Sequence, residues 1–181
     1  MIVAFYSDPH FGHRQVIGYC DRPFADLDAM HAALIANYNA MIGEEDTVVW
    51  TGDAFFMGHE AARDILDSMH GFKVLVRGNH DGGVSSCARV FDMVTDEMHV
   101  RIGDRHCVVS HYPYAGTVRR HGDVDTRYLD RRPQRVKGRV LIHGHTHSPR
   151  RRDGAMIHVG VDAWDYRPAT MAQVAALVSE V

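Results

Sequence analysis

Four short strings of the sequence place Asp, Asn and His side chains directly after runs of apolar, β-branched residues. The strings are Asp8-Pro9-His10, Gly52-Asp53, Gly78-Asn79-His80-Asp81 and Gly144-His145-Thr146-His147. A short apolar run of this kind predicts a buried strand, so each string should begin a loop at a strand's carboxyl end. Open α/β sheets bind their ligands beyond those ends. Carboxylate, amide and imidazole groups bind divalent metals, and the strings therefore predict a site for more than one such ion.

The same patterning predicts the elements that must position these side chains. We expect strands over residues 1–7, 46–51, 72–76, 91–93, 99–102, 106–110, 140–143 and 156–161. Helical spacing of apolar residues predicts helices over 26–42, 59–69 and 170–178. The strands 91–93, 99–102 and 106–110 look antiparallel, with a tight turn at Gly103-Asp104 joining the last two. Alternating strands and helices followed by paired strands indicate an α/β fold with two packed sheets between helices.

Length and composition limit the class of protein. The chain has 181 residues, so we expect one domain over residues 1–181 with a core of its own. Its apolar runs are all shorter than the roughly 18 residues of a membrane span, which predicts no membrane contact. The first residues lack a positively charged leader and run directly into Asp8. We therefore expect a cytoplasmic protein.

The cysteines suit neither a disulfide framework nor a Cys-based zinc site. There are three of them, Cys20, Cys87 and Cys107, an odd number without a close pair. We expect free thiols that are buried or partly buried.

Basic residues are concentrated in one part of the chain, although the formal net charge is only −3. Residues 119–152 contain eleven Lys and Arg against three Asp. Clustered Arg is expected where a protein grips phosphate, because the guanidinium fork matches phosphate oxygens. A long exposed loop rich in Arg for solubility is the alternative, and the polar stretch 113–137 has no clear secondary structure. Both interpretations stay open.

The order of the strings, with His111 after the run Cys107-Val108-Val109-Ser110, resembles a known family. Over nearly its whole length the chain is similar to the calcineurin-like metallophosphoesterase superfamily, in five blocks in the family's order. Locally, residues 7–13 and Arg22-Pro23-Phe24 resemble a compact bacterial and phage branch. The resemblance implies a four-layer α/β/β/α sandwich with two mixed sheets and a two-metal site at the sheet edge.

The resemblance also implies a division of the ligands between two divalent metal ions. It assigns Asp8, His10 and His147 to one ion, Asn79, His111 and His145 to the other, and Asp53 to both. A bridging carboxylate is consistent with the roughly 3.5–4 Å metal separation of two-metal phosphoryl chemistry. We expect Mn first, with Fe, Zn, Ni or Co as alternatives, because mixed His and carboxylate ligands suit them all.

The same resemblance implies a metal-dependent hydrolase of phosphate esters in which a hydroxide bridging the two metals attacks phosphorus. His80 would protonate the leaving oxygen or stabilise the transition state, and Asp81 would orient and charge its imidazole. A non-catalytic scaffold with this fold would be expected to lack some of these residues. A structural metal protein is disfavoured because closed structural sites tend to use Cys.

The substrate is less well defined. His13 and Arg14 follow the first string and are candidates for contact with the phosphate. A stacking surface for a base is one interpretation of four aromatic residues, and packing in the core or at the rim is the other: Tyr112, Tyr114, Trp164 and Tyr166. With the Arg-rich segment, the first interpretation favours a phosphodiesterase acting on a nucleotide or single-stranded nucleic acid. A phosphomonoesterase acting on a small molecule or nucleotide is the alternative.

Overall fold

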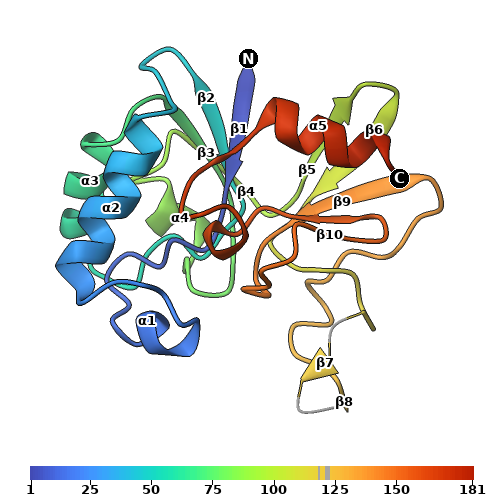
Figure 1. The fold of residues 1–181 in the computed structure, drawn as a ribbon, viewed down its shortest axis with the longest axis horizontal. Coiled ribbons are helices and arrows are strands. Elements are labelled where there is room, and N and C mark those ends of the chain that lie inside the picture. Colours follow the sequence, from blue (N-terminus) through green and yellow to red (C-terminus); the bar gives the residue numbers. More distant parts are fainter. Residues whose placement is uncertain (118, 121–122) are drawn as a thin grey trace.

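Two five-stranded sheets face each other in the computed structural model, which describes residues 1–117, 119–120 and 123–181 (Figure 1). The first sheet consists, in spatial order, of β12 (Ala169–Thr170), β1 (Ile2–Tyr6), β2 (Thr47–Trp50), β3 (Phe72–Val76) and β4 (Met93–Thr95). The second consists of β10 (Arg152–Asp153), β11 (Met156–His158), β9 (Arg139–His143), β6 (Arg105–Val109) and β5 (Met98–Ile102). Strands β1 to β4 are parallel, as are β6, β9 and β11, while β12, β5 and β10 run antiparallel to their neighbours. Both sheets are therefore mixed.

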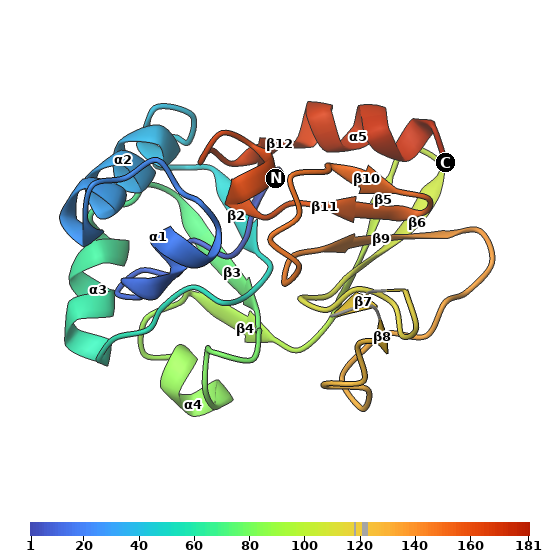
Figure 2. The ribbon, with the colours of Figure 1, turned by 60° about the horizontal axis from the view of Figure 1, so that its bottom comes forward.

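Helices cover the outer face of the first sheet. Figure 2 shows on that side α1 (Gln15–Tyr19), α2 (Leu27–Asn39), α3 (His59–Asp67) and α4 (Val84–Cys87), with α5 (Met171–Ser179) above the second sheet. Helix α2 begins at Asp26, whose side chain accepts a hydrogen bond from the Ala29 amide. Helix α5 begins with a reciprocal capping box between Thr170 and Gln173. Among the described residues, no helix combines the length and apolar composition that a membrane crossing requires.

Burial on both faces explains why the strands are continuous apolar runs in the sequence. In β2, Val48 and Trp50 face the helices and Val49 faces the second sheet, so both faces of the strand are buried. The core between the sheets also receives Val174 and Val178 of α5. A smaller cluster on the outer face of the second sheet contains Val108, Tyr114, Leu141 and Met156. The expected α/β sandwich of two mixed sheets is confirmed.

Two expected strands differ from the structure. The strand expected over 91–93 is β4, which begins at Met93 and pairs parallel to β3, because α4 lies in the connection between them. Phe91 instead packs in the core, with its ring centre 5.5 Å from that of Trp50. The strand expected over 156–161 ends at His158, and a 3₁₀ helix covers Val161–Ala163. Between them Gly160 bridges to Ser7 of the first sheet, so the chain leaves one sheet to join the other.

Elements of two to five residues are missing from the sequence-based expectations, because they are too short to show a period. They are α1, α4, β10, β12 and the antiparallel pair β7 (Arg119–Arg120) and β8 (Asp123–Val124). The last two lie in the stretch 113–137, of which residues 118, 121 and 122 are outside the described part.

Candidate metal centre

Six parallel strands end at the same edge of the molecule. Strands β1, β2 and β3 of the first sheet run parallel to one another, as do β6, β9 and β11 of the second, and the carboxyl ends of both sets lie around the lower middle of Figure 1, where the two sheets meet. The Ser7–Gly160 bridge and the hydrogen bond from the Val161 amide to the Ser7 carbonyl, 3.0 Å long, join the two sheets there. The four strings and His111 follow five of these strands, and they therefore meet at one place.

The candidate ligands form two groups in which all donor atoms lie within 4.8 Å of one another. The first group is Asp8, His10 and His147, and the second is Asp53, His111 and His145. In the second group, Nε2 of His111 lies 3.1 Å from Nδ1 of His145. Nδ1 of His111 donates to the Thr51 carbonyl at 2.7 Å, so Nε2 is the ring nitrogen that faces the second group.

Asp53 lies between the two groups. Its Oδ2 is 3.7 Å from Nε2 of His10 and 3.4 Å from Nε2 of His111. Its other oxygen accepts a hydrogen bond from the His80 amide at 2.9 Å. The carboxylate is thus held in place by the 78–81 loop while one oxygen faces both groups.

Several polar atoms at this place are buried without a hydrogen-bond partner among the described residues. They are both ring nitrogens of His10 and Oδ1 of Asn79. Burial lowers the pKa of His10 to about 2 and that of His145 to about 3, so both imidazoles keep a lone pair at neutral pH. Unsatisfied buried polar atoms are costly, and divalent cations would satisfy Oδ1 of Asn79 and the unprotonated ring nitrogen of His10. The residues present therefore fit a metal centre.

The backbone of the candidate ligands is strained. Five of them have positive φ angles: Asp8 at 55°, His10 at 53°, Asp53 at 52°, His145 at 68° and His147 at 50°. Nine non-glycine residues in the described chain have this conformation, so more than half of them are candidate ligands. Each costs about 1–3 kcal/mol and persists where the surroundings impose it, which occurs most often at functional sites.

Two glycines of the strings allow the loops to approach one another. A Cβ on Gly78 would collide with the Asp53 carboxylate and would lie 2.6 Å from the Asp53 amide nitrogen. A Cβ on Gly144 would collide with the side chains of Ser7 and Asp8. Close backbone approach therefore explains why glycine precedes the ligands.

Asp81 differs from its expected role of orienting His80. Its carboxylate accepts hydrogen bonds from three backbone amides, those of Gly78 at 2.6 Å and of Asp53 and Ala54 at 2.8 Å each. These amides belong to two loops, which Asp81 ties together. It acts as a positioning residue for the loop that carries Asp53, because its two oxygens are occupied by the backbone.

His80 faces the cavity of the site. Its side chain is 36% exposed, and its Nε2 lies 3.9 Å from Oδ2 of Asp53, too far for a hydrogen bond. Its ring centre is 5.4 Å from that of His10 and 5.5 Å from that of Phe56. The imidazole is thus close to both groups of candidate ligands and open to solvent.

Sequence reasoning missed a buried pair beneath the first group. Arg22 donates to the backbone carbonyls of Pro9 and Asp8 at 2.9 and 2.8 Å and forms a two-armed ion pair with Asp162 at 2.8 and 3.0 Å. Asp162 in turn binds Nδ1 of His147 at 2.7 Å. Burial alone would raise the pKa of Asp162, but the hydrogen bonds from His147 and Arg22 outweigh it and lower that pKa to about 2. A charged carboxylate therefore orients His147.

We expect Asp162→Asn to lower the affinity of the protein for divalent metals by about 10–100-fold. The amide loses the charge that holds Arg22 and orients His147, while the candidate ligands themselves remain. Competition against a chelator measures the affinity. Asp165→Asn is the matched control, because Asp165 is exposed and meets Arg151 at 3.5 Å. Equal affinities of the two variants would contradict the positioning role.

A cavity of about 490 Å³ opens over both groups. His10, Asp53, Asn79, His145 and His147 line it, while Asp8 and His111 are fully buried behind them. Other lining residues form two walls, Tyr19 of α1 with its neighbour Cys20, and Arg127 with Tyr128 after β8. Figure 1 shows α1 and the strands β7 and β8 projecting on opposite sides of this edge.

The candidate substrate-binding residues have three different positions. His13 lines the cavity and stacks on Phe56 with ring centres 4.7 Å apart. Arg14 is exposed at the start of α1 and is not among the lining residues described. Tyr112 is buried behind the site, where its ring centre lies 4.9 Å from that of His111 and 5.3 Å from that of His145.

The stacking surface suggested for four aromatic residues is wrong, and packing is what the structure shows. Tyr112, Tyr114 and Trp164 are buried, and Tyr166 packs edge-on against Phe24. Tyr19 and Tyr128 line the cavity instead. No period marks them in the sequence, because α1 is short and Tyr128 lies in the stretch without assigned structure.

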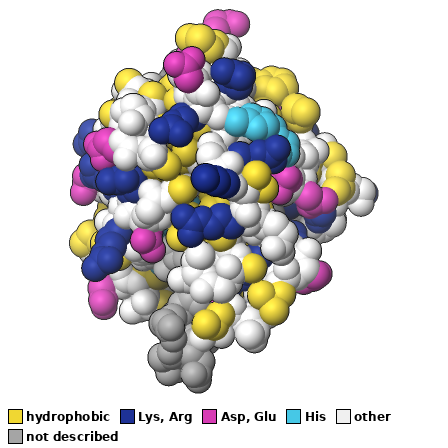
Figure 3. All heavy atoms as spheres, turned by 90° about the vertical axis from the view of Figure 1, so that its right-hand side faces the viewer, with side chains coloured by type: hydrophobic (Ala, Val, Ile, Leu, Met, Phe, Trp, Pro, Cys, Tyr) yellow, Lys and Arg dark blue, Asp and Glu magenta, His cyan; other side chains and the backbone are white. Residues whose placement is uncertain are grey.

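The Arg-rich segment does not act as one surface. Arg127 lines the cavity and pairs with Asp125 at 2.9 Å, Arg132 is buried against the same carboxylate at 3.2 Å, and Arg152 pairs with Glu180 at 3.2 Å. Figure 3 shows basic side chains gathered on another face, with acidic ones around them. The side chains of Arg119 and Arg120 lie outside the described part. Of the described Arg and Lys in the segment, Arg127 is thus the one at the cavity.

The three cysteines are free, as expected. Cys87 and Cys107 are buried, and Cys20 is partly buried in the cavity wall. Cys20 also lies near His147 and Asp162 in a further possible metal group. Both oxygens of Asp162 are engaged by Arg22 and His147, so Asp8 and His10 are the better partners for His147.

Comparisons with known proteins find one family model and several relatives of this chain. A family model described as a calcineurin-like phosphoesterase superfamily domain matches residues 1–162. The gene 66 protein of Mycobacterium phage L5 is 33% identical over 188 residues, covering 88% of this chain and 86% of the relative. An uncharacterized protein of Methanocaldococcus jannaschii, MJ1445, is 27% identical, covering 98% of this chain and 92% of the relative. The crystal structure of a protein of unknown function from Aquifex aeolicus, AQ665, matches with a TM-score of 0.74 and 25% identity over 98% of this chain and all of that one.

Proposed function

The chain belongs to the calcineurin-like phosphoesterase superfamily, and from that membership we propose that it hydrolyses nucleotide-like phosphodiesters at a centre of two divalent metal ions. Membership and the His and Asp groups support a metal-dependent phosphoesterase in general. The observation that carries the finer proposal is the position of Asp53, whose Oδ2 faces both groups of candidate ligands in one cavity.

The proposed ligands follow the two groups. Asp8, His10 and His147 would hold one ion, Asn79, His111 and His145 the other, and Asp53 both. When bound, two divalent ions polarise phosphoryl oxygens and make water a nucleophile at neutral pH. We favour Mn, and the mixture of imidazole and oxygen ligands also suits Fe, Zn, Ni or Co.

The chain's own residues position the substrate and move a proton. His80 opens into the cavity beside both groups, where its imidazole would donate a proton to the leaving oxygen. Asp81 fixes the loops of Asp53 and Gly78 through the backbone, so it keeps His80 and Asp53 in register. Asn79 contributes a neutral amide oxygen, which limits the negative charge that phosphate would meet.

The two walls of the cavity support a diester. A phosphodiester carries an organic group on each side of phosphorus, and the cavity has an aromatic ring in each wall, Tyr19 and Tyr128. Aromatic rings accept bases by stacking with little sequence preference. Arg127 beside Tyr128 also lines this wall, where its guanidinium is paired with Asp125 at 2.9 Å.

Hydrolysis of p-nitrophenyl esters tests the proposal. The protein, loaded in turn with Mn, Fe, Zn, Ni and Co, is assayed on bis-p-nitrophenyl phosphate and on p-nitrophenyl phosphate. We expect turnover of both, with the higher kcat/KM for the diester. A higher kcat/KM for the monoester would make the protein a phosphomonoesterase. Absence of turnover with every metal would overturn the enzymatic function.

A further inference from the structure

A row of aromatic rings runs along one wall of the cavity over the candidate metal centre. The ring centre of His13 lies 6.2 Å from that of Tyr19, edge-on, and 4.7 Å from that of Phe56, stacked. The ring centre of Phe56 is in turn 5.5 Å from that of His80. These rings, Tyr19, His13 and Phe56, are called the aromatic row below. The row leads from α1 to the residue proposed as the proton donor.

Two rings of the aromatic row are exposed to solvent. Among the described residues, three aromatic side chains are exposed, Tyr19 at 77%, Phe56 at 53% and Phe72 at 46%. Tyr19 and Phe56 lie beside the cavity, whereas Phe72 begins β3 at the end of the strand opposite to the ligand loop. Large hydrophobic side chains exposed together next to a site are typical of a ligand-binding surface.

Backbone contacts hold the aromatic row in a fixed position. The Phe56 amide donates to the Phe11 carbonyl at 2.7 Å, and the His13 amide donates to the His10 carbonyl at 3.0 Å. Gly12 has a φ of 85°, and a Cβ there would lie 2.8 Å from the Phe56 carbonyl oxygen. The loops that carry His13 and Phe56 therefore pack against each other. The exposed rings are thus presented on a rigid support, which lowers the entropic cost of binding a flat ligand.

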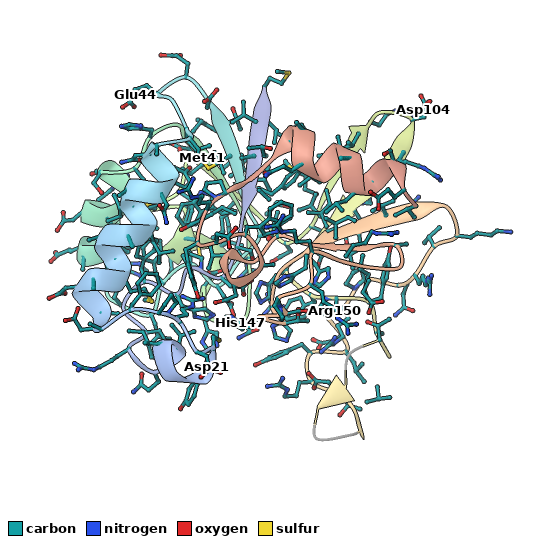
Figure 4. All side chains as sticks on the ribbon, viewed as in Figure 1. Asp21, Met41, Glu44, Asp104, His147 and Arg150 are labelled. Atoms are coloured by element: carbon teal, nitrogen blue, oxygen red, sulfur yellow. The ribbon has the colours of Figure 1, made fainter. Side chains whose placement is uncertain are left out.

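The two walls of the cavity adjoin different groups of candidate ligands. On the side of the aromatic row, the sulfur of Cys20, directly after α1, lies within 4.8 Å of a ring nitrogen of His147. Figure 4 labels His147 close to Asp21, the next residue of this turn. On the opposite side, the ring centre of Tyr128 lies 5.7 Å from that of His145. The two organic groups of a diester would therefore meet different walls, each beside its own group.

The position of His80 distinguishes the two walls. Its imidazole stands at the end of the aromatic row, against Phe56. A general acid gives its proton to the oxygen of the group that departs, so the leaving group lies on the side that the acid faces.

We propose that the aromatic row binds the leaving group of the diester by stacking, with Phe56 as the specificity-determining residue, while Tyr128 faces the group that stays on phosphorus. The inference rests on the proposed function, whose diester it orients in the cavity. A nucleoside is a leaving group of the required kind, because its base offers a flat face to the exposed rings.

Two p-nitrophenyl diesters separate the two walls. Bis-p-nitrophenyl phosphate and methyl p-nitrophenyl phosphate release the same p-nitrophenolate, but they keep an aromatic ring and a methyl group, respectively, on phosphorus. The kcat and KM of the wild type on both esters are compared with those of Phe56→Ala, Phe56→Tyr and Tyr128→Ala. Phe72→Ala is the matched control, because Phe72 is also an exposed phenyl ring but lies at the far end of β3.

We expect Phe56→Ala to raise KM about 5–10-fold on both esters without changing kcat, because the lost contact is with their shared leaving group. Tyr128→Ala should raise KM on bis-p-nitrophenyl phosphate alone, since only that ester keeps a ring on phosphorus. Phe56→Tyr retains the stacking ring and should match the wild type, as should Phe72→Ala.

The outcomes that contradict the inference differ from those that contradict the proposed function. An effect of Phe56→Ala confined to bis-p-nitrophenyl phosphate would assign the aromatic row to the retained group and overturn the inference. Wild-type KM values in Phe56→Ala would overturn it too, and so would an equal loss in Phe56→Tyr, which would show that stacking is not the cause. In all three cases the wild type still hydrolyses the esters. Absence of turnover by the wild type would instead overturn the proposed function, and the inference with it.

Discussion

Asp53→Asn is expected to abolish hydrolysis of the diester and to leave the protein with about two metal ions fewer per chain. Oδ2 of Asp53 lies 3.7 Å from Nε2 of His10 and 3.4 Å from Nε2 of His111, so it is shared by both groups of ligands. An amide in its place has no negative charge to offset two dications. Each group would then lack its common ligand at the same time. Elemental analysis and the bis-p-nitrophenyl phosphate assay measure the two effects.

The fold should survive this substitution. Oδ1 of an asparagine can still accept the His80 amide, which Asp53 accepts at 2.9 Å, and the side-chain volume hardly changes. Burial alone would raise the pKa of Asp53, but the neighbouring His111 and His10 outweigh it and hold that pKa well below its ordinary value, so the ionised carboxylate stabilises the metal-free fold and the metal-free variant should melt at a lower temperature than the metal-free wild type. Asp165→Asn is again the control and should keep full activity. A variant at Asp53 that retained one tightly bound ion would show that Asp53 serves a single metal.

The meeting of the candidate ligands could be predicted from the sequence because local patterns determine it. Asp8, Asp53 and His111 each follow a contiguous apolar run, and a strand buried on both faces produces such a run wherever it occurs. Parallel strands end at one edge, so residues that follow these runs meet in space. The same argument explains why a long helix with regular apolar spacing, such as α2, could be predicted with both ends correct to within a few residues.

The roles of Asp81, Asp162 and Arg22 could not be predicted, because contacts distant in sequence determine them. Asp81 binds the amides of Asp53 and Ala54, which lie in another loop. Asp162 follows a strand that ends early to bridge the sheets, and its partner Arg22 is 140 residues away. In the sequence, no local pattern distinguishes Asp162 from the other acidic residues of the chain, which has 23 in all. Its burial between Arg22 and His147 is visible only after the two sheets are assembled.

His80→Ala is expected to lower kcat by about 10²–10⁴ on substrates with a poor leaving group, without changing the metal content. Nε2 of His80 is 3.9 Å from the nearest oxygen of Asp53, and the contact that the 78–81 loop makes with Asp53 runs through the His80 backbone amide, which alanine retains. The loop and the ligand Asn79 should therefore stay in place. Elemental analysis of the variant checks this, and loss of the metals would mean that His80 is a ligand rather than an acid.

The leaving group separates proton donation from a general loss of activity. A p-nitrophenolate leaves without a proton, whereas the alkoxide of a nucleoside needs one. The ratio of the wild-type rate to the His80→Ala rate should therefore be much larger for a dinucleotide than for bis-p-nitrophenyl phosphate. His13→Ala is the matched control, because His13 lines the same cavity with its ring centre 6.2 Å from that of His80. An equal loss on both substrates would assign His80 to binding the phosphate. If only His13→Ala lost more rate on the dinucleotide than on bis-p-nitrophenyl phosphate, His13 would be the acid. Both imidazoles line the cavity, so either could reach a bound ester.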